Sequence, residues 1–153
     1  MNPVKVERSE PVYPAHFYIK PFIELTVEML DCVSKHNYRR LAEICDDDFG
    51  IIDIDVDGGS KIIRDRKEWE EWFQGLFPKL RAMNANTWSE ITGYEALKAT
   101  DMGYSVVDFN QLLQLPDRIL SFQVIATIIW RLKDGQWKES RYHSSLIGVK
   151  EVN

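Results

Sequence analysis

The sequence from Trp130 to Leu146, WRLKDGQWKESRYHSSL, predicts a β-hairpin. Hydrophobic and polar residues alternate on both sides of Asp134-Gly135. An Asp-Gly pair between two alternating runs is the strongest short signal for a hairpin with a two-residue turn. We therefore expect two long antiparallel strands that cover about 118–133 and 136–148.

A two-residue turn fixes which residues lie opposite each other in this hairpin. Counting outward from the turn, the expected pairs are Leu132 with Trp137, Trp130 with Glu139, Ile128 with Arg141, and Ala126 with His143. Cross-strand partners share a face of the sheet, so Glu139, Arg141 and His143 are expected together on one apolar face. Such a face, with a few convergent polar groups, suits a small-molecule site. An error of one residue in the register would move these side chains to the opposite face.

Further strands are expected upstream of the hairpin. Two alternating runs cover 86–98 and 103–115, and FGIIDIDV at 49–56 predicts the first strand of the chain. A short strand at 61–63 is expected after the turn residues Asp57-Gly58-Gly59.

Three helices are expected before and between these strands. Apolar residues at helical spacing begin near Lys20, and Asn37 is a candidate N-cap for a second, short helix. Asp65 is the candidate N-cap of a third helix, in which apolar residues recur from Trp69 to Leu80 and Pro78 is expected to introduce a kink or an early end. This order of elements predicts an α+β fold with the helices on one face of an antiparallel sheet.

The length of 153 residues fits one domain. Pro3, Pro11 and Pro14 predict an extended N-terminal arm at 1–17, because proline restricts its own backbone and that of the preceding residue. A single domain is expected at 18–153.

The overall charge and hydropathy exclude several classes of protein. The net charge of −5 and the pI of about 5.2 argue against nucleic-acid binding, which depends on clustered Lys and Arg. No apolar run is long enough to span a membrane, and the N-terminus has no apolar segment typical of a signal peptide, so a cytoplasmic location is expected.

The cysteines and histidines favour neither a disulfide framework nor a metal site. Cys32 and Cys45 lie on apolar stretches that predict helix, where a free thiol behaves as a small hydrophobic group. The three histidines, His16, His36 and His143, are far apart and form no HxH or HxxxH spacing. No glycine-rich phosphate loop occurs, so no metal and no cofactor are expected.

Three stretches of the chain resemble the nuclear transport factor 2-like superfamily, especially its SnoaL-like branch. They are LAEICDDDF at 41–49, DRKEWEEWF at 65–73, and the hairpin at 130–146. The resemblance extends over residues 20–148. It implies a cystatin-like curved sheet, a cone or barrel, that wraps around the three helices and encloses a pocket. It also implies a homodimer formed through the outer face of the sheet.

Asp53 is a further candidate functional residue, because isoleucines flank it in the first expected strand. Desolvation among such neighbours raises the pKa of a carboxyl toward the range of a general base. The resemblance implies the same role, since ketosteroid isomerase-like members place a general-base Asp at this position. The two residues that donate hydrogen bonds to the oxyanion in those members would correspond to Met29 and Ile128. Neither side chain can donate a hydrogen bond, so steroid isomerisation is not expected.

Fold resemblance alone does not select one function, so two hypotheses stay open. The first is a domain that binds a small apolar molecule, with proton-transfer catalysis of the isomerase, dehydratase or cyclase type. In it, Asp53 or His143 moves a proton and Arg141 stabilises an oxyanion, while the ligand contacts Trp69, Trp72, Trp130 and Glu139. The alternative is a non-catalytic dimeric accessory or assembly module that uses the outer sheet face.

The same residues also have purely structural interpretations. Asp53 can be the solvent-facing half of an alternating strand, and His143 can be a structural side chain near a strand end. Glu139 and Arg141 can form an ion pair of small energetic value. Trp69, Trp72 and Phe73 can be core residues, although one of these rings could also line a pocket.

Overall fold

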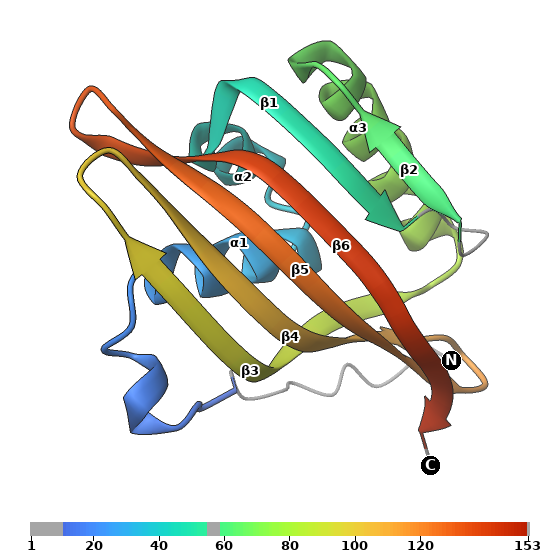
Figure 1. Cartoon of the computed structure of the whole chain (residues 1–153). Helices are drawn as coiled ribbons and strands as arrows, with labels where there is room; N and C mark the ends of the chain where they lie inside the picture. The colour runs from blue at the N-terminus through green and yellow to red at the C-terminus, as the bar shows by residue number, and fades with distance from the viewer. Residues whose placement is uncertain (1–10, 55–58, 153) are drawn as a thin grey trace.

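The computed structural model describes residues 11–54 and 59–152, which form helices packed against one curved sheet (Figure 1). The helical elements are a 3-10 turn at Ala15–Phe17, α1 at Ile23–Ser34, α2 at Tyr38–Ile44 and α3 at Arg66–Ala82. The strands are β1 at Cys45–Ile54, β2 at Ser60–Ile63, β3 at Asn86–Lys98, β4 at Met102–Gln114, β5 at Ile119–Lys133 and β6 at Gln136–Val152. This order confirms the α+β prediction.

Local signals in the sequence account for where two helices begin. The Asn37 side chain accepts a hydrogen bond from the backbone N–H of Arg40 at 3.2 Å, and the Asp65 side chain accepts one from the N–H of Glu68 at 2.9 Å. Each bond satisfies a donor that the first turn of a helix leaves free. The expected early end of α3 at Pro78 is wrong, because the helix continues to Ala82.

The six strands follow the order β2-β1-β6-β5-β4-β3 in one sheet. Four of the five neighbouring pairs are antiparallel, whereas β1 and β6 are parallel. The predicted curved antiparallel sheet is present, with this one parallel pair within it. The parallel pair brings the first strand of the chain beside the last.

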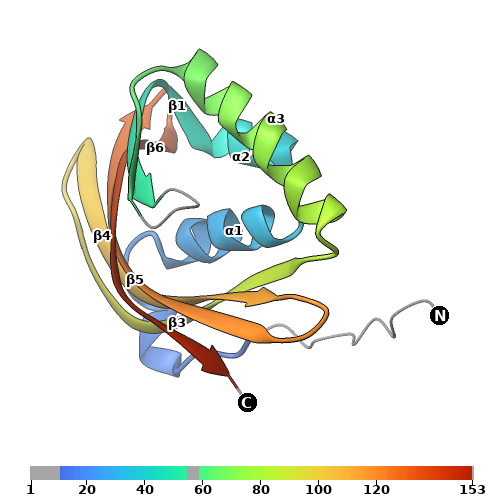
Figure 2. The same ribbon diagram turned by 90° about the vertical axis from the view of Figure 1, so that its right-hand side faces the viewer.

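The sheet curves around the helices without closing into a barrel, and α1 lies within its concave side (Figure 2). The core fills this concavity with apolar side chains from α1, α3 and the inward-facing positions of the strands. Trp130 and Ile128 on β5, both 0% exposed, lie at its centre. No helix in the two described ranges has both the length and the apolar character needed to cross a membrane.

The turn of the C-terminal hairpin lies at Asp134-Gly135, as predicted. Both residues have positive φ, 51° and 78°, which a two-residue hairpin turn of this type requires. The predicted pairs Leu132–Trp137 and Trp130–Glu139 are both confirmed.

Beyond Glu139 the predicted pairing is wrong, because β6 contains a β-bulge at Ser140. Arg141 lies opposite Ile129 instead of Ile128, and His143 lies opposite Thr127 instead of Ala126. One extra residue reverses the alternation of faces from that point onward.

The segment before α1 is not wholly extended. The predicted arm at 1–17 contains the 3-10 turn Ala15–Phe17, and the Phe17 side chain is buried against the core. Residues 1–10, together with the end of the predicted first strand and its turn at 55–58, lie outside the described residues.

Candidate functional site

A group of buried polar side chains lies on the concave side of β1 and β6. It consists of Cys45 and Asp53 from β1 and of Glu139, Tyr142 and Ser144 from β6, and we call it the polar cluster. The parallel register, in which Ile51 pairs with Tyr142, places Asp53 beside Ser144.

Asp53 is held by two hydrogen bonds to the same carboxylate oxygen. The Ser144 hydroxyl donates to Oδ1 at 2.6 Å, and the backbone N–H of Ile54 donates to it at 2.7 Å. Burial raises the pKa of Asp53, and both hydrogen bonds oppose the rise because they stabilise the charged form. Although part of the residue reaches solvent, protein surrounds its carboxyl group. The structure therefore places Asp53 inward, and not on the solvent side of the strand.

Glu139 is more deeply buried than Asp53, with 3% of its surface exposed. Its Oε1 accepts a weak hydrogen bond from the Cys45 thiol at 3.7 Å, while Oε2 has no partner among the described residues. Burial raises the pKa of Glu139 to about 8, and the nearby Asp53 carboxyl contributes to the rise. At neutral pH this group is mostly a neutral acid that can donate a hydrogen bond.

The other two ionisable members of the cluster stay neutral. Burial raises the pKa of Tyr142 well above its ordinary value, and the Asp53 and Glu139 carboxyls raise it further. Burial also raises the pKa of the Cys45 thiol strongly, which removes the thiolate needed for nucleophilic attack. The cluster thus combines a carboxyl that ionises more easily, Asp53, with neutral donors. Two carboxyls whose environments separate their pKa values are typical of a general base and a general acid.

Arg141 and His143, which the sequence predicts beside Glu139, lie on the opposite face of the sheet and are exposed. The Arg141 guanidinium donates to the Asp48 backbone carbonyl at 2.9 Å and to its carboxylate at 3.3 Å. The bulge at Ser140 causes both misplacements. The sequence signal missed Tyr142 and Ser144 for the same reason, since a regular register turns them outward.

The tryptophans predicted to contact a ligand are largely part of the core. Trp69 is 1% exposed and packs edge-on against Phe49 and Phe73. Trp130 stacks on Phe22, with ring centroids 5.6 Å apart, and its indole N–H donates to Ser105 Oγ at 3.0 Å. Trp72 is half-buried on α3.

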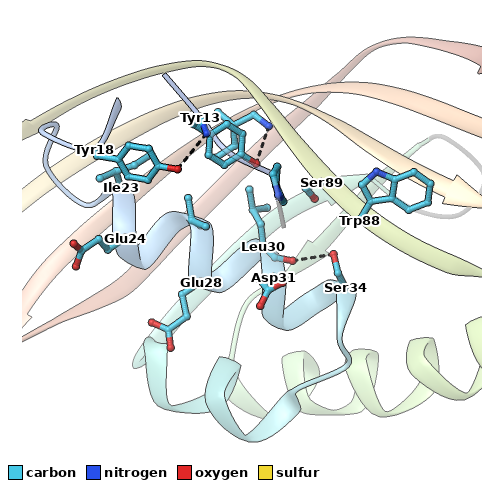
Figure 3. A pocket seen from close by; sticks show the side chains of 13 residues that line it. Tyr13, Tyr18, Ile23, Glu24, Glu28, Leu30, Asp31, Ser34, Trp88 and Ser89 are labelled. Carbon is cyan, nitrogen blue, oxygen red and sulfur yellow. Dashed lines mark hydrogen bonds between the residues drawn. The ribbon is translucent and has the colours of Figure 1, made fainter. Parts of the chain in front are cut away.

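Two hollows adjoin α1. The interior hollow has about 140 Å³ of empty space, too narrow for a water molecule, and Tyr142 links its apolar lining to the polar cluster. The second hollow has a volume of about 380 Å³, lies between α1, the segment before it and β3 (Figure 3), and is lined by no residue of the polar cluster. Among the residues that the structure describes, no group of three His, Cys, Asp or Glu side chains is placed to hold a metal ion.

The fold defines a class of proteins. The structure superposes on an NTF2-like protein with a cystatin-like fold from Novosphingobium aromaticivorans, with a TM-score of 0.67 at 13% identity, covering 81% of this chain and 78% of that one. Within this class the chain belongs to the SnoaL-like domain family, whose model matches residues 23–149. The resemblance carried by the three sequence stretches is thereby confirmed.

Two other solved structures share the fold. A type 2 hexachlorocyclohexane dehydrochlorinase (LinA) superposes with a TM-score of 0.68 at 20% identity, covering 84% of both chains. The CaMKII hub homology domain of Chlamydamonas reinhardtii superposes with a TM-score of 0.68 at 16% identity, covering 82% of this chain and 95% of that one. No curated protein matches the chain. At such identities the likeness concerns the fold alone.

Proposed function

We propose that this SnoaL-like domain binds a small apolar molecule and transfers a proton at the polar cluster. The observation that carries the proposal is that two carboxyls, Asp53 and Glu139, face the interior in different environments. Asp53 is hydrogen-bonded by Ser144, whereas Glu139 is buried with one oxygen lacking a partner among the described residues. A buried polar atom without a partner, in a group with a shifted pKa, is a common mark of a functional site.

The two carboxyls take different roles in this proposal. Asp53 removes a proton from carbon, since its raised pKa makes it a stronger base than an exposed aspartate. Glu139, with a pKa of about 8, donates a hydrogen bond to the oxyanion or leaving group that forms. This neutral acid takes the place of the oxyanion donors that Met29 and Ile128 cannot supply.

A ligand in this interior requires the surrounding side chains to move. The hollow beside Tyr142 is too narrow to admit a water molecule, whereas usual ligand sites have volumes of roughly 300–1,000 Å³. Met29 and Leu30 of α1 line it. We infer that these two side chains shift outward when a ligand enters. Because the side chains that would contact the ligand are mostly apolar, an apolar ligand fits this space better than a polar one.

A thermal-shift screen of small apolar compounds, followed by turnover assays on the hits, tests this function. Asp53→Asn is expected to lower turnover about a hundredfold. Turnover should also fall above pH 8, as Glu139 ionises, and Glu139→Gln should abolish this alkaline limb. Glu71→Gln, an exposed carboxyl on α3, is the control. A hit whose turnover is unchanged in Asp53→Asn would refute the catalytic role, and a hit that is bound without turnover would leave only binding.

A second observation favours association between copies of the chain. The outer face of the sheet exposes apolar side chains from several strands, namely Ile52, Ile62, Leu97, Tyr104 and Ile125. Apolar side chains exposed on one face of a sheet favour association, and a hub homology domain shares the fold. We propose a homodimer through this face. Sedimentation should show a dimer in the unmodified chain and a monomer in Ile125→Glu, and a monomeric unmodified chain would refute the proposal.

A further inference from the structure

The second hollow, which is lined by no residue of the polar cluster, is a candidate for a separate binding site. We call it the α1 groove. It lies between α1, residues 11–18 and the first half of β3, and has a volume of about 380 Å³ (Figure 3). That volume falls within the usual range for sites that bind small molecules. None of its lining residues belongs to the polar cluster.

Aromatic rings from two distant parts of the chain line the α1 groove. Tyr13 and Tyr18 precede α1, and Trp88 lies on β3. Backbone hydrogen bonds fix the tyrosines, since the N–H of Tyr13 donates to the Tyr18 hydroxyl at 3.1 Å and the N–H of Ile91 donates to the Tyr13 hydroxyl at 3.3 Å. The rings are therefore held in place before any ligand arrives.

The charged side chains that line the α1 groove within residues 11–54 and 59–152 are all carboxylates. Glu24, Glu28 and Asp31 follow one stripe of α1 at spacings of four and three residues, and among the lining residues that the structure describes there is no Lys, Arg or His. Arg40 holds Glu28, with its Nη2 at 3.1 Å from Oε2, and Lys35 lies 2.9 Å from Asp31.

Glu24 differs from the other two carboxylates. It is exposed at the start of α1 and has no ion pair or hydrogen bond with any described residue. Two groups at such a site attract a cation: the carboxylate through its negative charge, and the aromatic rings through the negative potential of their faces.

We propose that the α1 groove binds a small organic cation with an apolar body, such as an arylalkylammonium ion. The ammonium group lies near Glu24 at one end of the groove, and the apolar body extends past the tyrosines toward Trp88 at the other end (Figure 3). An anion of the same shape is repelled by Glu24, because Glu28 and Asp31 are already paired with Arg40 and Lys35.

Three probes of matched shape test the charge preference. They are 6-phenylhexylammonium, the neutral 6-phenylhexan-1-ol and the anionic 6-phenylhexanoate, which are long enough to extend from Glu24 toward Trp88, and they are titrated while the tryptophan indole N–H signals are followed by NMR. Trp88→Phe identifies the Trp88 signal. The ammonium ion should shift that signal saturably and bind about threefold to tenfold more tightly than the alcohol. The anion should cause no shift.

Variants separate a local effect from the general charge of the protein. Glu24→Gln should reduce the affinity for the ammonium ion to that for the alcohol. Glu71→Gln removes the same charge from α3 and should leave affinity unchanged, as should Asp53→Asn in the polar cluster. Equal binding of all three probes, no saturable shift at Trp88, or equal losses in Glu24→Gln and Glu71→Gln would each overturn the proposal.

Discussion

The Ser144 hydroxyl lies 2.6 Å from Oδ1 of Asp53 and joins the last strand of the chain to the first. Because this hydrogen bond stabilises the ionised carboxylate, it holds the pKa of Asp53 below the value that burial alone would produce. The two residues are 91 positions apart in the sequence, so their contact depends on the parallel pairing of β1 with β6.

Ser144→Ala is therefore expected to raise the pKa of Asp53 further. The substitution removes a hydrogen bond to the charged form and leaves the desolvation in place. The side-chain carboxyl carbon of Asp53, followed by NMR against pH, gives the measurement. Ser145→Ala, at the neighbouring exposed position, is the matched control and should leave the titration unchanged. An unchanged or lower pKa of Asp53 in Ser144→Ala would show that the bond does not form in solution.

Glu139 is expected to make the protein less stable as the pH rises. Its pKa increases from an ordinary value of 4.5 to about 8 on folding, so the folded state binds the proton more tightly than the unfolded state. The contribution of protonated Glu139 to the free energy of unfolding is fully present below pH 4.5 and is lost as the pH rises to about 8. The free energy of unfolding falls by at most about 1.4 kcal/mol per pH unit in this range. Glu139→Gln should remove this loss and be the more stable form at pH 9, by on the order of a few kcal/mol.

Urea unfolding at pH 5, 7 and 9 measures this difference. The contribution of Asp53 is present in both proteins and cancels to first order. Parallel stability curves for the unmodified chain and Glu139→Gln would contradict a neutral, buried Glu139.

Trp130→Phe is expected to cost about 1–3 kcal/mol of unfolding free energy, because it leaves the buried Ser105 hydroxyl without its indole partner. Trp88→Phe, at a half-buried position in the α1 groove, should cost much less. Guanidinium unfolding compares the two. Equal losses would mean that Trp130 is not a core residue.

His143→Ala is expected to change stability by less than about 0.5 kcal/mol, the usual range for exposed positions. It should also leave the pKa of Asp53 unchanged, because the two side chains lie on opposite faces of the sheet. Denaturant unfolding and the NMR titration check both statements. A shifted pKa of Asp53 would support the regular hairpin register in place of the bulged one.

The sequence predicted those features that depend on neighbouring residues. The caps at Asn37 and Asp65 and the turn at Asp134-Gly135 need only local hydrogen bonds or local backbone conformation, and all three are present. Strand alternation predicted β3 and β5 closely for the same reason. The hydrophobic environment of Asp53 was also readable from its flanking isoleucines.

The face assignment after Ser140 could not be predicted in this way. The bulge occurs where β6 also pairs with β1, whose own register shifts between Cys45 and Gly50 as their partners pass from Glu139 to Arg141. A contact between strands so far apart in the chain leaves no periodic signal in either one. The sequence therefore predicted Asp53 and Glu139 of the polar cluster, but it did not predict Tyr142 and Ser144.

The bulged strand β6 connects side chains on the inner face of the sheet with side chains on its outer face. Tyr142 and Ser144 point inward while Arg141 and His143, their immediate neighbours, point outward. A displacement of the outer side chains moves the same short segment of backbone that positions the Ser144 hydroxyl beside Asp53. Contact with a second copy of the chain on the outer face would thus change the pKa of Asp53 without direct contact with its carboxyl group.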